Sequence, residues 1–198
     1  MEHPDWPAFV AAIVADPDDD TARLVAADFL EENGDPDRAA FIRIQVQLAR
    51  LDASGAGKSL EADDLRKKER AFLGAWAVYP SLWAAAECPE LVRMTSWGDG
   101  RETIQGAHRL VWRRGFVDKV TCPAEEWLHH GHAVRKRNPI RGVVLTGCYQ
   151  LTRDDWYVLA PTLTGLHDLT LAGGDQDEAL AAWLRPRLPG VVIDVVPF

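Results

Sequence analysis

The sequence lacks the features that mark secreted or membrane-spanning chains. No apolar run approaches the roughly 20 residues that a helix needs to cross a bilayer, and the start, MEHPDWPAFV, has neither the basic nor the apolar stretch of a secretory signal. Cysteine is scarce as well, because Cys88, Cys122 and Cys148 are odd in number and form no Cys-x-x-Cys pair. Buried free thiols are therefore expected in place of disulfides, and the sequence predicts a cytoplasmic protein that makes no membrane contact.

Positive charge is also in deficit. The chain has 22 lysines and arginines against 30 acidic residues, and its formal net charge of −8 argues against non-specific attraction of the whole surface to nucleic acid or anionic lipid. The deficit is local, because residues 1–40 hold 11 acidic and 2 basic residues whereas residues 101–141 hold 4 acidic and 9 basic residues. The protein is thus predicted to be acidic at its beginning and mildly basic in its middle.

Motifs of catalysis and cofactor binding are missing too. Gly57-Lys58-Ser59 resembles the end of a phosphate-binding loop, but Asp52 stands where that loop requires glycine. His129 and His132 are one helical turn apart and could face a shared metal ion, yet the His-Glu-x-x-His pattern and a nearby thiolate pair are absent. Surface histidines are the preferred interpretation. We therefore expect no enzymatic activity, no cofactor and no bound metal.

The chain does contain clear helical patterns in its first half. Apolar residues at helical spacing predict three helices in about the first fifty residues, and further helical pattern continues to about Ala86. Asp5 is expected to cap the first helix, and Asp20 or Thr21 the second. Asn33-Gly34 is a left-handed terminator of the second helix.

The second half contains a weak internal repeat of short apolar segments. The strand candidates are residues 116–121, 143–146, 169–171 and 191–196. Their equivalent centres, separated by 26, 26 and 24 residues, are taken as Val117, Val143, Leu169 and Ile193. This step lies in the range of leucine-rich repeats, in which each unit is one strand and one helix, so parallel strands are expected. Arg114-Gly115 is predicted to form either a hairpin or a bulge ahead of the array.

Connecting helices are predicted in the gaps between these strands, beginning near Pro123, Thr152 and Asp175. The chain has 8 tryptophans, which is many for its length. Four of them fall at apolar helical positions and are expected to anchor the core, namely Trp76, Trp83, Trp156 and Trp183.

One N-terminal motif resembles a known family. Pro17-Asp18-Asp19-Asp20, followed by Arg23-Leu24-Val25-x-Ala27-Asp28-Phe29-Leu30-Glu31-Glu32-x-Gly34-Asp35, is similar to the repeat-companion domain abundant in planctomycete-type bacteria. Phe29 stands where that family usually has tryptophan. The resemblance covers about the first fifty residues. It implies a companion or interaction role, because the family has no established enzymatic activity to carry over.

That domain commonly precedes leucine-rich-repeat proteins, and Leu110-Val111-Trp112-x-Arg114-Gly115-Phe116-Val117 resembles the start of such arrays. The expected fold is therefore α/β, with an N-terminal helical unit packed on a short leucine-rich-repeat-like array of parallel strands and helices. We place the helical unit at residues 1–88 and the array at residues 89–198. The helical unit is hypothesised to cap one end of the array.

The predicted function is a non-catalytic protein–protein interaction module, an adaptor or accessory subunit whose partner is another protein. The first alternative is an accessory protein of a nucleic-acid-containing complex, which would use the basic region Arg109–Arg141. The second alternative is a metal-dependent hydrolase. Residues expected to contact a partner are Trp112, Arg113, Arg114, Arg135, Arg137, Arg141, Thr146, Tyr149, Gln150, Asp168 and Thr170.

Overall fold

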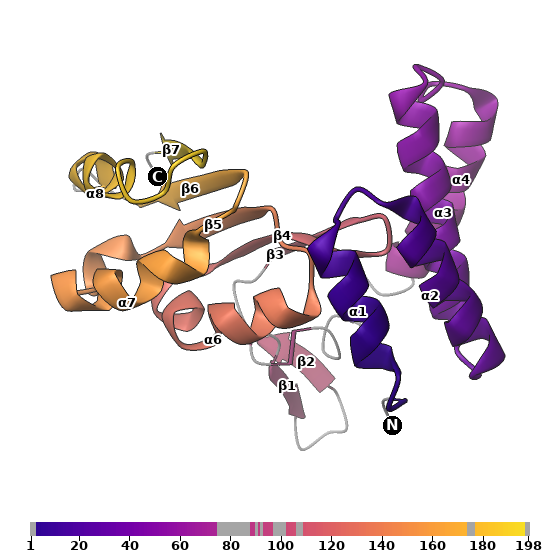
Figure 1. Cartoon of the computed structure of the whole chain (residues 1–198), viewed down its shortest axis with the longest axis horizontal. Helices are drawn as coiled ribbons and strands as arrows, with labels where there is room; N and C mark the ends of the chain where they lie inside the picture. The colour runs from indigo at the N-terminus through magenta and orange to yellow at the C-terminus, as the bar shows by residue number, and fades with distance from the viewer. Residues whose placement is uncertain are drawn as a thin grey trace.

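The protein is an α/β structure in which N-terminal helices pack on a mostly parallel sheet, as predicted (Figure 1). The computed structural model describes residues 3–74, 88–89, 91, 93–96, 102–105, 109–173 and 177–196. In chain order the elements are α1 (Trp6–Ala15), α2 (Asp20–Glu32), α3 (Pro36–Ala53), α4 (Leu60–Gly74), β1 (Arg93–Ser96), β2 (Glu102–Gln105), β3 (Arg109–Arg113), β4 (Phe116–Pro123), α6 (Ala124–Arg137), β5 (Gly142–Thr146), the 3-10 helix η1 (Cys148–Gln150), α7 (Arg153–Leu163), β6 (Asp168–Ala172), α8 (Asp177–Leu184) and β7 (Val192–Val196).

The three N-terminal helices are confirmed, but two of the expected caps are not. Asp5 precedes α1 with helical backbone angles, so its carboxylate is not directed at the free N–H groups and makes no capping hydrogen bond. The cap of α2 is Asp19, whose extended backbone lets its carboxylate accept a 2.8 Å hydrogen bond from the backbone N–H of Thr21. Asp20 is instead the first helical residue, and it pairs with Arg50 at 2.8 Å.

The main sheet has five strands in the order β3-β4-β5-β6-β7. The strands from β4 to β7 are parallel, as the repeat predicts, and β3 pairs antiparallel with β4. Their aligned centres are Val120, Val143, Leu169 and Ile193. Val117 is therefore not the first centre. It belongs to the hairpin, where it pairs with Trp112, and the parallel pairing of β4 begins only at Lys119.

The β3–β4 connection is both a hairpin and a bulge. Arg114 and Gly115 have φ angles of 50° and 84°, the two positive values that a type I′ turn requires. The register also shifts between Val111 and Trp112, which bends the ladder. A separate antiparallel pair, β1 with β2, was not predicted from the sequence.

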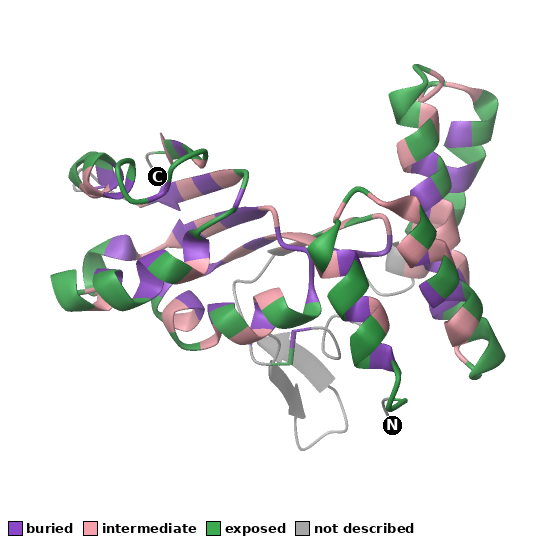
Figure 2. Ribbon diagram, viewed as in Figure 1, coloured by how far each residue is buried: buried purple, intermediate pink, exposed green. Residues whose placement is uncertain are grey.

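The core of the array lies between one face of the sheet and its helices. Val120, Val143, Leu169 and Ile193 are buried in one cluster with helical residues that include Trp127 of α6 and Leu159 of α7. Alternate residues along each strand point to the other face, so β6 shows alternating burial in Figure 2. Within the described residues, no helix combines the length and apolar composition needed to cross a membrane.

The expected helix caps and tryptophan anchors have mixed outcomes. Thr152 caps α7 with a complete capping box, and α6 begins directly after Pro123. Trp156 is buried, whereas Trp183 is partly exposed and packs against the core from outside. The predictions that fall on residues 76, 83 and 175 lie outside the described residues.

The helical unit joins the array through Phe116, the first residue of β4. Phe116 belongs to the core cluster of α1, α2 and α3 and stacks on Trp6 at 6.2 Å between ring centroids. Next to it, the backbone N–H of Gly115 donates a 2.6 Å hydrogen bond to the side-chain oxygen of Gln45. The unit lies against the β3–β4 turn, and α1 packs along α6. Helices and sheet therefore share buried residues across the predicted boundary near residue 88.

We predict that Gly115→Ala is far more destabilising than Gly190→Ala. Both glycines have nearly the same φ, 84° and 83°, so alanine meets the same left-handed strain of about 1–2 kcal/mol at each position. Only at Gly115 would the new Cβ lie 2.8 Å from the Ile42 Cα, which cannot move without displacing α3. We expect an additional cost of about 1–3 kcal/mol for this overpacking, measured by denaturant unfolding. Equal losses in the two variants would contradict a tight junction.

Candidate functional site

The main sheet presents a second face, opposite α6, α7 and α8. Strand register sets its side chains in three cross-strand rows, because alternate residues of neighbouring parallel strands lie side by side. We call this surface the open face. Its rows are Val111-Lys119-Gly142-Asp168-Val192, Thr121-Val144-Thr170-Asp194 and Pro123-Thr146-Ala172-Val196.

An ion pair lies in the first row of the open face, at the amino-terminal end of the parallel strands. The Lys119 ammonium is 2.5 Å from the Asp168 carboxylate although a whole strand, β5, runs between β4 and β6. The strand residue between them is Gly142, and a Cβ added there would be 2.7 Å from the Asp168 carboxylate. Glycine therefore leaves the gap through which the two charges meet. Both side chains are about one-third exposed, so the pair contributes little to stability and remains accessible.

Around this ion pair the open face mixes methyl and hydroxyl groups. Val111, Val192 and Val196 are among the exposed large hydrophobic residues, and the three threonines of the face are partly exposed. A threonine offers one hydroxyl donor and acceptor beside a methyl group. Such a surface suits contact with another polypeptide, in which apolar area and scattered hydrogen bonds combine.

The structure places part of the predicted contact set on this surface. Thr146, Asp168 and Thr170 lie on the open face. Tyr149 and Gln150 lie in η1, directly after β5, and both are exposed. The sequence prediction named none of the valines on this face, nor Thr121 and Asp194. Strict alternation with the buried residues of each strand was the signal that could have identified them.

Arg141 was predicted to contact a partner beside these residues, and its position contradicts that expectation. It precedes β5 at the opposite, amino-terminal end of the strand, and its side chain is only 12% exposed. Its guanidinium donates a 2.6 Å hydrogen bond to Asp118 and lies 3.4 Å from Asp18. Arg141 therefore joins the sheet to the loop between α1 and α2.

Other members of the predicted basic surface are also engaged internally. Arg114 is 14% exposed and pairs with Asp18 at 2.9 Å. Arg135 donates hydrogen bonds of 2.6 and 2.8 Å to the carbonyl oxygens of Thr162 and Thr164 at the end of α7. These contacts leave less free positive charge than the sequence suggested.

The remaining residues of the basic stretch divide into packed and exposed side chains. Trp112 packs edge-on against Phe41 and under the guanidinium of Arg38. Arg113 and Arg137 are exposed. Trp112 is thus part of the junction with the helices and not a free aromatic platform.

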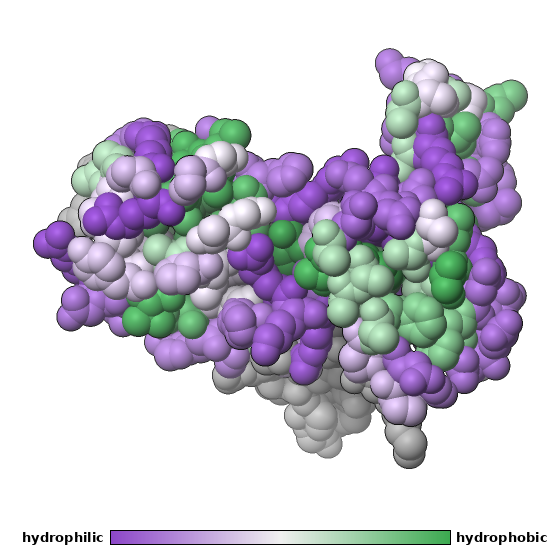
Figure 3. Space-filling model, in the orientation of Figure 1, coloured by the Kyte–Doolittle hydropathy of each residue, from purple (hydrophilic) through white to green (hydrophobic). Residues whose placement is uncertain are grey.

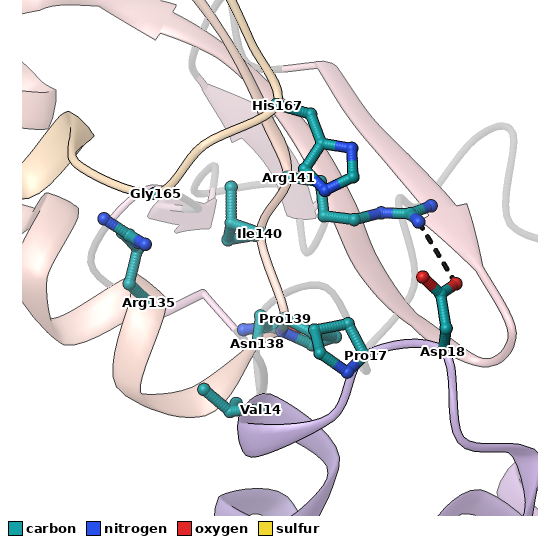
Figure 4. Close-up of a pocket in the computed structure, with 10 residues that line it drawn as sticks. All are labelled: Val14, Pro17, Asp18, Arg135, Asn138, Pro139, Ile140, Arg141, Gly165 and His167. Carbon is teal, nitrogen blue, oxygen red and sulfur yellow. Dashed lines mark hydrogen bonds and ion pairs between the residues drawn. The ribbon is translucent and has the colours of Figure 1, made fainter. Parts of the chain in front are cut away.

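A small pocket of about 160 Å³ opens where the helical unit meets the array (Figure 4). Arg135 lies on one side of it, and Arg141 and His167 lie on the other. Asp18 occupies the rim and already pairs with Arg141. The pocket could admit only a small group, and this carboxylate offsets its positive charge, so it is a weaker candidate than the open face.

The thiols and histidines form no metal-ligand group in the described part of the chain. Cys88, Cys122 and Cys148 are free and buried, as predicted. Burial raises the pKa of Cys122 and raises that of Cys148 to about 12, so neither is a thiolate at neutral pH. Among the described residues, no three His, Cys, Asp or Glu side chains are grouped as metal ligands would be.

Comparison of the chain with models of known protein families, with curated proteins and with solved structures gives no match.

We predict that Cys122 and Cys148 resist thiol reagents in the native protein at pH 8. A pKa near 12 leaves about one Cys148 thiol in ten thousand ionised at that pH, and burial blocks access to it. Mass spectrometry after brief exposure to a maleimide should find both residues unmodified. The same treatment in guanidinium should modify both, and rapid labelling without denaturant would contradict the buried placement.

Proposed function

We propose that this protein is a non-catalytic interaction module, an adaptor or accessory subunit that binds another protein through the open face. The cytoplasm is its proposed location, which the three buried free thiols support. We further propose that residues 1–50 are a repeat-companion unit and that the sheet is a short leucine-rich-repeat-like array. The resemblance of the N-terminal motif and the succession of parallel strand and helix units support this assignment.

The observation that carries the proposal is the one-sided sheet. Helices bury one face of strands β4 to β7, and the other face keeps valine and threonine side chains at the surface. A sheet face that is partly apolar and accessible gains free energy when a partner covers it. The Lys119–Asp168 pair on this face is internally neutral, so shape and hydrogen bonding, more than net charge, would select the partner.

The nucleic-acid alternative has less support than the sequence suggested. Arg114 and Arg141 pair with carboxylates, and Arg135 binds backbone carbonyls. A cation that is already engaged has to break these contacts before it can neutralise a phosphate. The metal-dependent hydrolase alternative gains no ligand group from the described residues.

We predict that a photo-crosslinking residue placed on the open face joins the protein to one specific partner. Benzoylphenylalanine would replace Val144 or Thr170, in neighbouring strands of the same row, and the full chain would be irradiated in extract of its native cells. Both positions should yield the same crosslinked protein. The matched control is Ala12, which is exposed on α1, outside the sheet, and should yield no such product.

The identified partner would then be purified and its affinity measured directly. Thr146→Arg with Thr170→Arg should weaken binding about tenfold or more, because two bulky cations would disrupt a complementary contact. Ala12→Arg should leave the affinity unchanged. Equal crosslinking from all three positions, or undiminished binding by the double variant, would refute the open face as the docking surface.

A further inference from the structure

A cluster of aromatic and arginine side chains lies on α7, on α8 and on the turn that follows α8, on the helical side of the sheet. We call Arg153, Tyr157, Trp183 and Arg187 the aromatic–arginine cluster. The Tyr157 and Trp183 rings meet edge to face at 5.1 Å between centroids, and Tyr157 is 49% exposed. The Arg187 guanidinium lies 4.0 Å from the Trp183 ring centroid, and its Nη1 donates to the Trp183 carbonyl oxygen at 2.8 Å. This hydrogen bond fixes the cation over the indole.

Two guanidinium groups converge on Tyr157. The Arg153 and Arg187 groups lie 6.0 and 5.9 Å from the centre of its ring. Hydrogen bonding and positive charge from Arg153, and to a smaller extent from Arg187, lower the pKa of the Tyr157 hydroxyl. The potential at this hydroxyl is therefore positive, although the whole chain has a formal net charge of −8.

Neither arginine of the cluster has an acidic partner among the residues that the structure describes. Arg185 is different, because it lies 3.9 Å from the Glu178 carboxylate. Arg114 and Arg141 at the junction also pair with carboxylates. Arg153 and Arg187 thus hold two exposed positive charges against an aromatic platform, without a carboxylate to neutralise them.

We infer that the aromatic–arginine cluster is a second binding site, one that takes a carboxylate-bearing segment of a partner protein. Guanidinium groups bind carboxylates with paired, charge-assisted hydrogen bonds, and tyrosine, tryptophan and arginine are the residues most enriched at binding hot spots. The site is separate from the open face, because α7 and α8 pack on the other side of the sheet. The cluster would add a charge-selective contact to the shape-selective contact that we propose for the open face.

An acidic peptide fits the cluster better than a nucleic acid. Only two cations are present, and the acidic residues Asp154 and Glu178 on the same helices would repel a long polyanion. Val158, next to Tyr157 in the chain, is also exposed and offers contact to an apolar side chain. Figure 3 shows that hydrophilic and apolar residues alternate over this end of the molecule. A short segment with one or two carboxylates and a neighbouring apolar residue matches that pattern.

The test is binding of a fluorescein-labelled peptide with an amidated C-terminus, Gly-Glu-Leu-Glu-Gly, to the purified full chain, followed by fluorescence anisotropy at low salt. Arg153→Gln and Arg187→Gln should each weaken binding about tenfold, since each removes one charge-assisted contact. Arg185→Gln is the matched control and should bind as the unaltered protein does, because Arg185 already pairs with Glu178. Arg187→Gln also removes the hydrogen bond from Arg187 to Trp183, which would loosen the end of α8. Arg153→Gln leaves that hydrogen bond in place, so it tests the loss of one charge alone.

Several results would overturn this inference. These are the absence of peptide binding, an equal loss in Arg185→Gln, and equal affinity for a peptide in which glutamine replaces each glutamate. Tighter binding of a short oligonucleotide of the same charge, sensitive to the same two substitutions, would assign the cluster to nucleic acid instead. Because the open-face variants leave α7 and α8 untouched, failure here and failure of the open-face experiment are separate outcomes.

Discussion

The structure depends on the burial of Phe116 against Trp6 and two arginines. Phe116 begins β4, yet its ring lies in the core of the N-terminal helices, stacked on Trp6. The guanidinium groups of Arg23 and Arg38 lie 5.8 and 5.3 Å from its centre. Both arginines are almost fully buried, and burial lowers the pKa of Arg23, so the aromatic face and nearby oxygens must compensate for lost hydration. This contact fixes the sheet to the helices.

The two faces of the sheet differ in what covers them. The hairpin before Phe116 aligns β4, and each later strand takes its register from the strand before it. Helices then fill one face, where they also assemble the aromatic–arginine cluster, while the open face keeps its alternating valines and threonines. The two binding surfaces that we propose, the open face and the aromatic–arginine cluster, therefore lie on opposite sides of the same sheet.

The acidic beginning and basic middle of the chain have a structural explanation as well. Asp18 pairs with both Arg114 and Arg141, and Asp20 lies 3.4 Å from Arg114. Part of the positive charge that suggested a nucleic-acid surface is thus neutralised by ion pairs within the molecule. Residues almost a hundred positions apart neutralise each other, which composition alone could not reveal because it contains no distances.

Local patterns in the sequence determined the elements: the helices before residue 54, the capping box at Thr152, the left-handed turn at Arg114-Gly115 and the strands with alternating burial. These features depend on neighbours a few residues away, so they can be recognised without the fold. Tertiary structure decided the register that made Val120 the first centre, the burial of Arg141 and the meeting of Tyr157 with Trp183. Such contacts arise from packing between distant segments, and spacing along the chain does not specify them.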